Sequence, residues 1–254
     1  MQSPKERIAA LAEEGRFVPL SLSDWRMRGF VRQSSAVSPT VTVYIESDGA
    51  PWLAPDLPPR DPTPIRPYVV RMASADPAPA VAYLGRPCQQ LEPEQLHGCD
   101  PQWWIQARYS ESVVSATNEA VSAAKARTGA QEVKLVGYSG GGTVAALVAE
   151  RRDDVACLVT VAAPLDTEAW TQTIGVSPLS RSLNPASGAE RLARVPQTHF
   201  RGGKDSVVPP ATGRQYLRQT PNARVIDLPR SDHDCCWADD WRELRAQSCL
   251  AESR

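Results

Sequence analysis

A serine on a glycine-flanked turn is the residue of this sequence best placed to act as a nucleophile. The segment 133–143 reads VKLVGYSGGGT and sets the pattern G-x-S-x-G around Ser139, between an apolar run and a helical pattern rich in alanine and valine. Such a strand–turn–helix context strains the serine backbone and points the hydroxyl away from the sheet. The next amide, on Gly140, lies at a helix N-terminus, where N–H groups favour an oxyanion. We therefore predict Ser139 as a nucleophile and Gly140 as an oxyanion donor.

A serine hydroxyl needs a positioned base, and histidine is the usual base near neutral pH. The sequence holds three histidines. His97 lies in a short loop between two cysteines, and His199 lies in an apolar, strand-like run that is typical of a core histidine. His233 follows the last predicted strand in a polar loop, at the end of the sheet where ligands gather. The sequence predicts His233 as the base.

A carboxylate must orient the imidazole and stabilise its charged form. Asp205 follows a predicted strand and a glycine-rich turn, at the same end of the sheet as the serine. Asp166, which follows the preceding strand, is the alternative. Asp232 and Asp234 flank His233 in sequence and are interpreted as solvated loop charges. We predict Asp205 as the third member.

Aromatic and basic residues near these motifs are candidates for the walls of a substrate pocket. Tyr138 is adjacent to Ser139 and must lie near the site, and Trp104 and Trp170 are further candidates for an apolar substrate wall. Aromatic residues are more often simply core residues, so packing is the alternative interpretation. Three basic residues are candidates for contact with an anionic substrate group, or else are solvated: Arg86, Arg108 and Lys204.

The elements that must position these residues alternate between apolar runs and helical patterns. Short β-branched and aromatic runs, apolar on both faces, predict buried strands at 41–45, 81–84, 133–136, 156–162 and 225–228. Helical spacing predicts helices after Pro4, at 113–124 before Gly129, and at 143–150. This order indicates an α/β fold with a mostly parallel central sheet covered by helices on both faces. We predict one domain over 1–254.

Two irregular segments interrupt this pattern. The proline-rich stretch 48–67 is expected to form neither a helix nor a central strand. The stretch 166–195 contains Pro178, Asn184 and Gly188 and resembles an insertion between two strand–helix units. Long loops are uncommon unless they are functional, so we predict a small lid or pocket wall there, with a plain surface excursion as the alternative.

Composition excludes several classes of protein. The chain has 254 residues with 42% hydrophobic and 22% charged residues, enough to bury one large core. A net charge of −1 creates no positive electrostatic potential that would attract nucleic acid or an anionic membrane. No window approaches the roughly 18–20 apolar residues that span a bilayer. We expect no nucleic-acid partner, no transmembrane segment, no metal and no cofactor, while the oligomeric state is left open.

Six cysteines form an even and clustered set, which is typical of an oxidising compartment. Cys88 and Cys99 bracket a short loop and are expected to form a disulfide. Near the C-terminus we expect Cys236 to bond Cys249, with Cys235 as the alternative partner.

Cys157 lies in a predicted buried strand and is expected to be an apolar thiol, with a bond to Cys235 as the alternative. The cysteines favour a periplasmic or secreted protein, although the charged segment 1–17 carries no export signal. A cytoplasmic location is the alternative.

The order Ser139, Asp205 and His233 on successive strand ends resembles the α/β-hydrolase superfamily, from about Val41 to the C-terminus. The phrases VYIESDG, AYLGRPC and PLDTEAW resemble a group of bacterial α/β-hydrolase-like proteins, several of them exported or lipoprotein-like. In the superfamily the loop after the first of these strands commonly reads His-Gly-x and supplies a second oxyanion donor.

Here Glu46, Ser47 and Asp48 occupy that place. The resemblance implies the Asp48 amide as donor, or that of Gly49 if the loop is shifted by one; a plain turn is the alternative.

The resemblance and the three residues together imply a serine hydrolase that forms an acyl-enzyme on Ser139 and needs no cofactor. A carboxylic ester of small-molecule size is the expected substrate. An amidase or peptidase would use the same residues with a different leaving group. A binding protein that has the fold without turnover is a third hypothesis.

Overall fold

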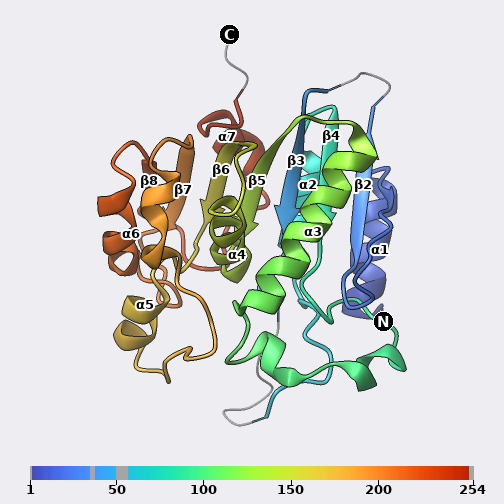
Figure 1. Ribbon diagram of the computed structural model, residues 1–254, viewed down its shortest axis with the longest axis horizontal. Coiled ribbons are helices and arrows are strands. Elements are labelled where there is room, and N and C mark those ends of the chain that lie inside the picture. The colour runs from blue at the N-terminus through green and yellow to red at the C-terminus, as the bar shows by residue number, and fades with distance from the viewer. Residues whose placement is uncertain (1, 35–37, 50–56, 252–254) are drawn as a thin grey trace.

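One eight-stranded sheet forms the centre of the computed structural model, which describes residues 2–34, 38–49 and 57–251 (Figure 1). The strands are β1 (Val18–Pro19), β2 (Gly29–Gln33), β3 (Thr40–Ile45), β4 (Ala80–Leu84), β5 (Glu132–Tyr138), β6 (Val155–Val161), β7 (Gln197–Gly202) and β8 (Arg224–Leu228). Their spatial order is β1-β2-β4-β3-β5-β6-β7-β8.

Six neighbouring strands run parallel, as the apolar runs predict: β4, β3, β5, β6, β7 and β8. The two N-terminal strands, β1 and β2, extend the sheet antiparallel at the β4 edge. Both strands are short and partly exposed, so they lack the continuous apolar run that predicts the buried strands, and they were not predicted. The α/β fold with a mostly parallel sheet is confirmed.

Helices cover both faces of this sheet. They are α1 (Pro4–Glu14), α2 (Tyr68–Ala75), α3 (Glu111–Thr128), α4 (Gly140–Ala149), α5 (Thr167–Ile174), α6 (Arg214–Gln219) and α7 (Trp241–Ala246). Short 3-10 turns are η1 (Gln95–Gly98), η2 (Pro101–Trp104), η3 (Pro185–Ser187), η4 (Ala189–Leu192) and η5 (Pro210–Gly213). Helices α3, α4 and α6 pack on one face and α1, α2 and α7 on the other.

Local sequence explains where the first and longest helices start and stop. Helix α1 begins with a capping box, in which the Ser3 hydroxyl accepts from the Glu6 amide and the Glu6 carboxylate accepts from the Ser3 amide. Helix α3 ends at Gly129, whose left-handed backbone closes the last turn. Both boundaries follow from the sequence.

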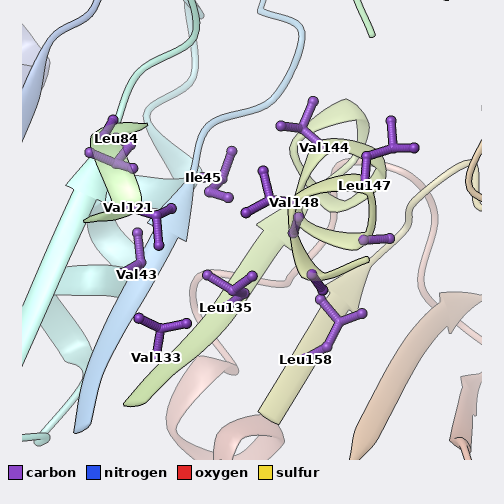
Figure 2. Packing of buried hydrophobic residues seen from close by; sticks show 14 of the residues in the cluster. Val43, Ile45, Leu84, Val121, Val133, Leu135, Val144, Leu147, Val148 and Leu158 are labelled. Carbon is purple, nitrogen blue, oxygen red and sulfur yellow. The ribbon is translucent and has the colours of Figure 1, made fainter. Parts of the chain in front are cut away.

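Alternate residues of the central strands feed two separate cores. Along β3, Val43 and Ile45 pack on the face of α3 and α4, whereas Tyr44 packs on the face of α2 and α7. Figure 2 shows Val43 and Ile45 in one cluster with Val121 of α3 and Val148 of α4. Because both faces are covered by helices, the strands are apolar throughout rather than alternating.

The sheet has a topological switch between β3 and β5. The chain passes from β3 to β4 on one side, and then returns to place β5 on the other side of β3. Loops that leave β3 and β5 therefore diverge, which opens a crevice at the carboxyl ends of the strands. This edge lies at the bottom of Figure 1, where α5 also lies.

The proline-rich stretch forms no helix and no sheet strand in its described residues, 48–49 and 57–67; residues 50–56 lie outside the described part. No helix in the described ranges is long and apolar enough to cross a membrane.

The disulfide pairing differs in part from the sequence prediction. Cys88 and Cys99 are joined, with 6.1 Å between their Cα atoms. Cys249 bonds Cys157 of β6, not Cys236, and the Cα atoms are 5.8 Å apart. Cys235 and Cys236 bond each other. The predicted Cys236–Cys249 bridge and the free Cys157 thiol are therefore wrong.

Cys236 and Cys249 do not bond because they lie at opposite edges of the sheet. The Cys249 amide donates to the side chain of Thr198 near the start of β7, which places Cys249 at the amino ends of the strands. Cys157 lies near the start of β6, on the face that α7 covers. Cys236 lies in the loop after β8, at the carboxyl ends.

The two longer-range bridges should stabilise the protein unequally. The Cys157–Cys249 bridge spans 92 residues and the Cys88–Cys99 bridge spans 11. In the chain-entropy model, removing the longer one should cost about 2 kcal/mol more than removing the shorter. We expect the double variant Cys157→Ala/Cys249→Ala to lose more free energy of unfolding in urea than Cys88→Ala/Cys99→Ala. Equal losses would contradict this expectation.

Candidate active site

Ser139 lies on a sharp turn between β5 and α4. Its backbone has φ 52° and ψ −129°, a conformation in which a residue with a side chain is strained. The amide of Ser139 donates to the carbonyl of Val161 in β6 at 2.8 Å, so the sheet itself holds the strained residue. A Cβ atom at Gly137 would collide with the backbone of Gly141, which explains the glycine two positions before the serine.

A continuous chain of hydrogen bonds links Ser139, His233 and Asp205. The Ser139 hydroxyl lies 3.0 Å from Nε2 of His233, and Nδ1 of His233 lies 2.8 Å from a carboxylate oxygen of Asp205. Because a carboxylate only accepts, Nδ1 carries a proton and a neutral imidazole leaves Nε2 free to accept from the serine. This is the arrangement of a serine with a positioned base.

Asp205 is fixed before it meets the histidine. Its side chain is fully buried, and the oxygen that does not contact His233 accepts from the amides of Val207 and Val208 at 2.9 and 2.7 Å. These amides hold the carboxylate in one orientation.

The backbone of His233 is fixed by two aromatic side chains. The Tyr138 hydroxyl and the Trp237 indole N–H both donate to the His233 carbonyl at 2.8 Å. Tyr138 lies beside Ser139 and also lines the cavity, as expected of a pocket residue. Sequence reasoning did not assign Trp237; the signal available was a tryptophan four residues after the histidine in an otherwise polar loop.

The alternative acid, Asp166, and the two other histidines lie away from Ser139. Asp166 caps α5, and its side chain accepts from the Ala169 amide and the Asn184 amide group, both at 3.1 Å. His199 is buried beside Thr160, and burial lowers its pKa to about 3. His97 is exposed in the disulfide loop. None of the three is hydrogen-bonded to Ser139 or Asp205.

A cavity of about 1070 Å³ opens beside Ser139 and His233. The segment 166–195 supplies part of its wall through α5 and the loop that follows. Trp170 lines the cavity, and its indole N–H donates to the Val207 carbonyl at 2.7 Å. Most of the remaining wall is apolar or aromatic: Pro64, Ile65, Tyr68, Tyr109, Pro164, Ile174, Val176, Leu179, Val207 and Val208.

Trp104 does not line this cavity, so its prediction as a pocket wall is wrong. It is buried in a separate cluster with Cys88, Leu91 and Ile105. The turn η2 directs the ring toward the loop closed by the Cys88–Cys99 bridge, where it packs beneath that loop.

The loop after β3 forms the side of the cavity near Ser139, where Ser47, Asp48 and Gly49 all contribute. Gly49 has φ 75°, and its amide donates to the Ser47 hydroxyl at 3.3 Å. The Asp48 amide has no acceptor in the described part of the chain. Of the two amides considered as oxyanion donors, that of Asp48 is therefore the one without an internal partner.

The Asp48 carboxylate is held by three donors. It accepts from Arg86 at 3.0 Å, from Arg108 at 3.2 Å and from the Tyr109 hydroxyl at 2.7 Å. Burial alone would raise the pKa of Asp48, but the two guanidinium groups more than offset this and lower it. The carboxylate lies so close to Gly140 that a Cβ atom there would collide with it. The acidic side chain near the predicted oxyanion site is thus neutralised.

Glu46 is a second buried acid in this loop. Its carboxylate accepts from the Ser47 amide at 2.7 Å, the Ser47 hydroxyl at 2.9 Å and the Tyr83 hydroxyl at 2.9 Å. Burial raises the pKa of Glu46 to about 7, because it outweighs these hydrogen bonds. The raised pKa of Glu46 could not be predicted from neighbouring residues, because Tyr83, one of its hydrogen-bond donors, lies 37 residues away.

The described residues contain no group of three or more histidine, cysteine or acidic side chains that could hold a metal ion.

Comparisons with known proteins agree with the topology. A family model described as alpha/beta hydrolase fold matches residues 97–181. The structure resembles Est1E from Butyrivibrio proteoclasticus, with a TM-score of 0.64 and 11% identity over 93% of this chain and 99% of that one. This chain has the α/β-hydrolase fold.

Other similar structures carry different activities in their names. The esterase domain of a Rhodothermus marinus protein has a TM-score of 0.58 and 15% identity, over 92% of this chain and 95% of that one. A puromycin hydrolase has a TM-score of 0.62 and 17% identity, over 91% of this chain but 38% of that one. No curated protein matches this chain in sequence. At these identities the likeness establishes the α/β-hydrolase fold only.

Glu46 should make stability depend on pH. Because its pKa is about 7 in the folded protein and near 4.5 when unfolded, the folded state binds more protons between these values. The free energy of unfolding should therefore fall as pH rises through this window, by up to about 3 kcal/mol. Glu46→Gln, which cannot ionise, should lose less stability than the wild type between about pH 5 and pH 8 in urea unfolding.

The matched control is Glu94→Gln at an exposed position, which should follow the wild-type pH dependence. A Glu46→Gln profile parallel to the wild type would contradict the role of burial.

Proposed function

We propose that this protein is a serine hydrolase that cleaves carboxylic esters of small-molecule size. The observation that carries the proposal is the unbroken hydrogen-bonded chain from the Ser139 hydroxyl through His233 to the buried Asp205. A serine becomes a useful nucleophile only when a base is held in this way.

The proposed reaction has two halves. Nε2 of His233 takes the hydroxyl proton while Oγ of Ser139 attacks the ester carbonyl carbon, and Asp205 stabilises the resulting imidazolium. The negative oxygen of the tetrahedral intermediate accepts from the amides of Gly140 and Asp48. The C–O bond to the alcohol breaks, and His233 returns the proton to the leaving oxygen. Water, deprotonated by His233, then releases the acid from Ser139 by the reverse sequence.

The cavity supports a substrate with a sizeable apolar portion. Its volume of about 1070 Å³ lies at the upper end for small-molecule sites, and aromatic and aliphatic side chains dominate its wall. An amide or peptide substrate is the second candidate, because acylaminoacyl peptidases are among the similar structures. The two candidates differ in the leaving group, and assays with p-nitrophenyl esters and aminoacyl amides separate them.

The alternative of a binding protein without turnover predicts a different site. A protein that had lost turnover would have no need of the strained serine or of the two amides that fix Asp205, yet both features are present. Covalent labelling by a fluorophosphonate at Ser139 would distinguish an active hydrolase from a silent one.

We also propose that the protein works in the periplasm or outside the cell. All six cysteines are engaged in disulfides, and such bridges persist in oxidising compartments. Non-reducing peptide mapping of protein isolated from its native host would test this, and free Cys88 and Cys99 thiols would contradict it.

Ser139→Ala should remove nearly all turnover of p-nitrophenyl esters without unfolding the protein. Loss of one member of such a triad leaves only a residual acceleration of about 10³ to 10⁴ over water. The measurement is initial hydrolysis rate beside a thermal unfolding curve. Substantial activity in the purified variant, with contaminating hydrolases excluded, would sink the assignment of Ser139.

Asp205→Asn should lower kcat by about 10⁴, because an amide cannot hold the imidazole in the required tautomer. Asp166→Asn is the matched control: Asp166 is also a buried aspartate that accepts hydrogen bonds from amides, but it does not contact His233. Its kcat should change far less. If the larger loss falls on Asp166→Asn, the proposed acid is the wrong one.

A further inference from the structure

Three charged side chains form a buried cluster at the wall of the cavity beside Ser139. Asp48 lies between Arg86 and Arg108, and the side chains of the three are only 13%, 4% and 9% exposed. Two guanidinium groups and one carboxylate give these three side chains one net positive charge. Glu46 is a further buried acid that interacts with Arg86, but burial raises its pKa to about 7, so near neutral pH it balances that charge only in part. An uncompensated charge in such a dry place is costly unless an anion meets it.

The two arginines differ in where their unused donor lies. Nε of Arg86 is buried and has no hydrogen-bond partner among the described residues. Arg86 gives one terminal nitrogen to Asp48 and the other to the Arg108 carbonyl, and its guanidinium lies over the Tyr109 ring. It does not line the cavity. Arg86 is therefore a structural partner of Asp48.

Arg108 lines the cavity and has a donor to spare. Nε donates to the Ile105 carbonyl at 2.6 Å, and Nη1 donates to Asp48 at 3.2 Å. Nη2 has no acceptor among residues 2–34, 38–49 and 57–251, and it is not enclosed by protein. These contacts fix the guanidinium plane and leave an edge open to the cavity, which is a preorganised site for a carboxylate.

No other cationic side chain in the described wall is held in a buried position where it could bind a carboxylate. Arg66 also lines the cavity, but it pairs with Asp234 at 2.6 Å, and both side chains are more than half exposed. Such an exposed pair is screened and contributes little. The remainder of the wall is mostly apolar.

We propose that Arg108 binds a free carboxylate of the substrate, so that the preferred substrates are esters that also carry a carboxylate. This inference rests on the proposed ester hydrolysis and adds the chemical class of its substrate. The anion completes the charge balance of the cluster while the apolar wall holds the rest of the molecule.

The test compares matched anionic and neutral esters. One series consists of p-nitrophenyl monoesters of dicarboxylic acids from succinic to suberic acid, each paired with the ester of the monocarboxylic acid of equal chain length. A second series places the carboxylate on the leaving phenol instead, which locates the anion on the acyl or the alcohol side. The quantity measured is the anionic-to-neutral ratio of kcat/KM.

We expect the ratio to exceed one in at least one series for the wild type, and to fall about tenfold to a hundredfold in Arg108→Met, which removes a charged hydrogen bond. Arg108→Lys, which keeps the charge but loses the planar fork, should give an intermediate ratio. Arg71→Gln, in the partly exposed ion pair with Asp239 outside the cavity, should keep the wild-type ratio.

A ratio that Arg108→Met leaves unchanged, or an equal loss on both esters of each pair, would overturn the carboxylate site. Should Arg108→Met fail to fold, inhibition of wild-type neutral-ester hydrolysis decides the matter: suberate should inhibit and suberamide should not, and equal effects would overturn the proposal. If no ester is hydrolysed and Ser139 is not labelled, it is the proposed function that fails. If neutral esters are hydrolysed through Ser139 without any anionic preference, only the carboxylate site fails.

Discussion

The carboxyl ends of parallel strands meet at one edge of a sheet, and the hydrogen-bonded chain of Ser139, His233 and Asp205 depends on that constraint. Neighbouring strands lie about 4.8 Å apart, so β5 and β8 are separated by more than any one side chain can reach. The loop after β8 must therefore return over β7 and β6 to bring His233 to the serine. Tyr138 and Trp237 hold it there through the His233 carbonyl. The sheet sets the direction of approach, and these two donors set the final position.

The loop after β3 brings acidic side chains to a place where negative charge would develop in the proposed reaction. Glu46 is raised in pKa by burial, whereas Asp48 is neutralised by two arginines. The disulfide loop supports this arrangement, because Gln89, next to Cys88, donates to the Ser47 carbonyl at 3.0 Å. The Cys88–Cys99 bridge thus braces the same loop that lies beside Gly140. The contacts that hold this loop in place therefore also fix the positions of its two buried acids.

The similar structures share the fold while their names span esterases and peptidases. Substrate choice must then come from the parts that the common sheet does not dictate. In the proposed hydrolase those parts are α5 with the loop that follows it, and the cluster of Asp48, Arg86 and Arg108. The first supplies an apolar wall, and the second supplies a positive charge within it.

Features that depend on neighbouring residues could be predicted from the sequence. Continuous apolar runs predicted the parallel strands, and glycines around Ser139 predicted the strained turn, because both signals lie within a few positions of the chain. Contacts between residues far apart in the chain became known only from the folded structure. Cys249 bonds Cys157 because α7 delivers it to the amino ends of the strands, and Trp104 is buried because its turn faces the disulfide loop. The partners of Asp48 lie 38 to 61 residues away, a separation over which local pattern carries no information about contact.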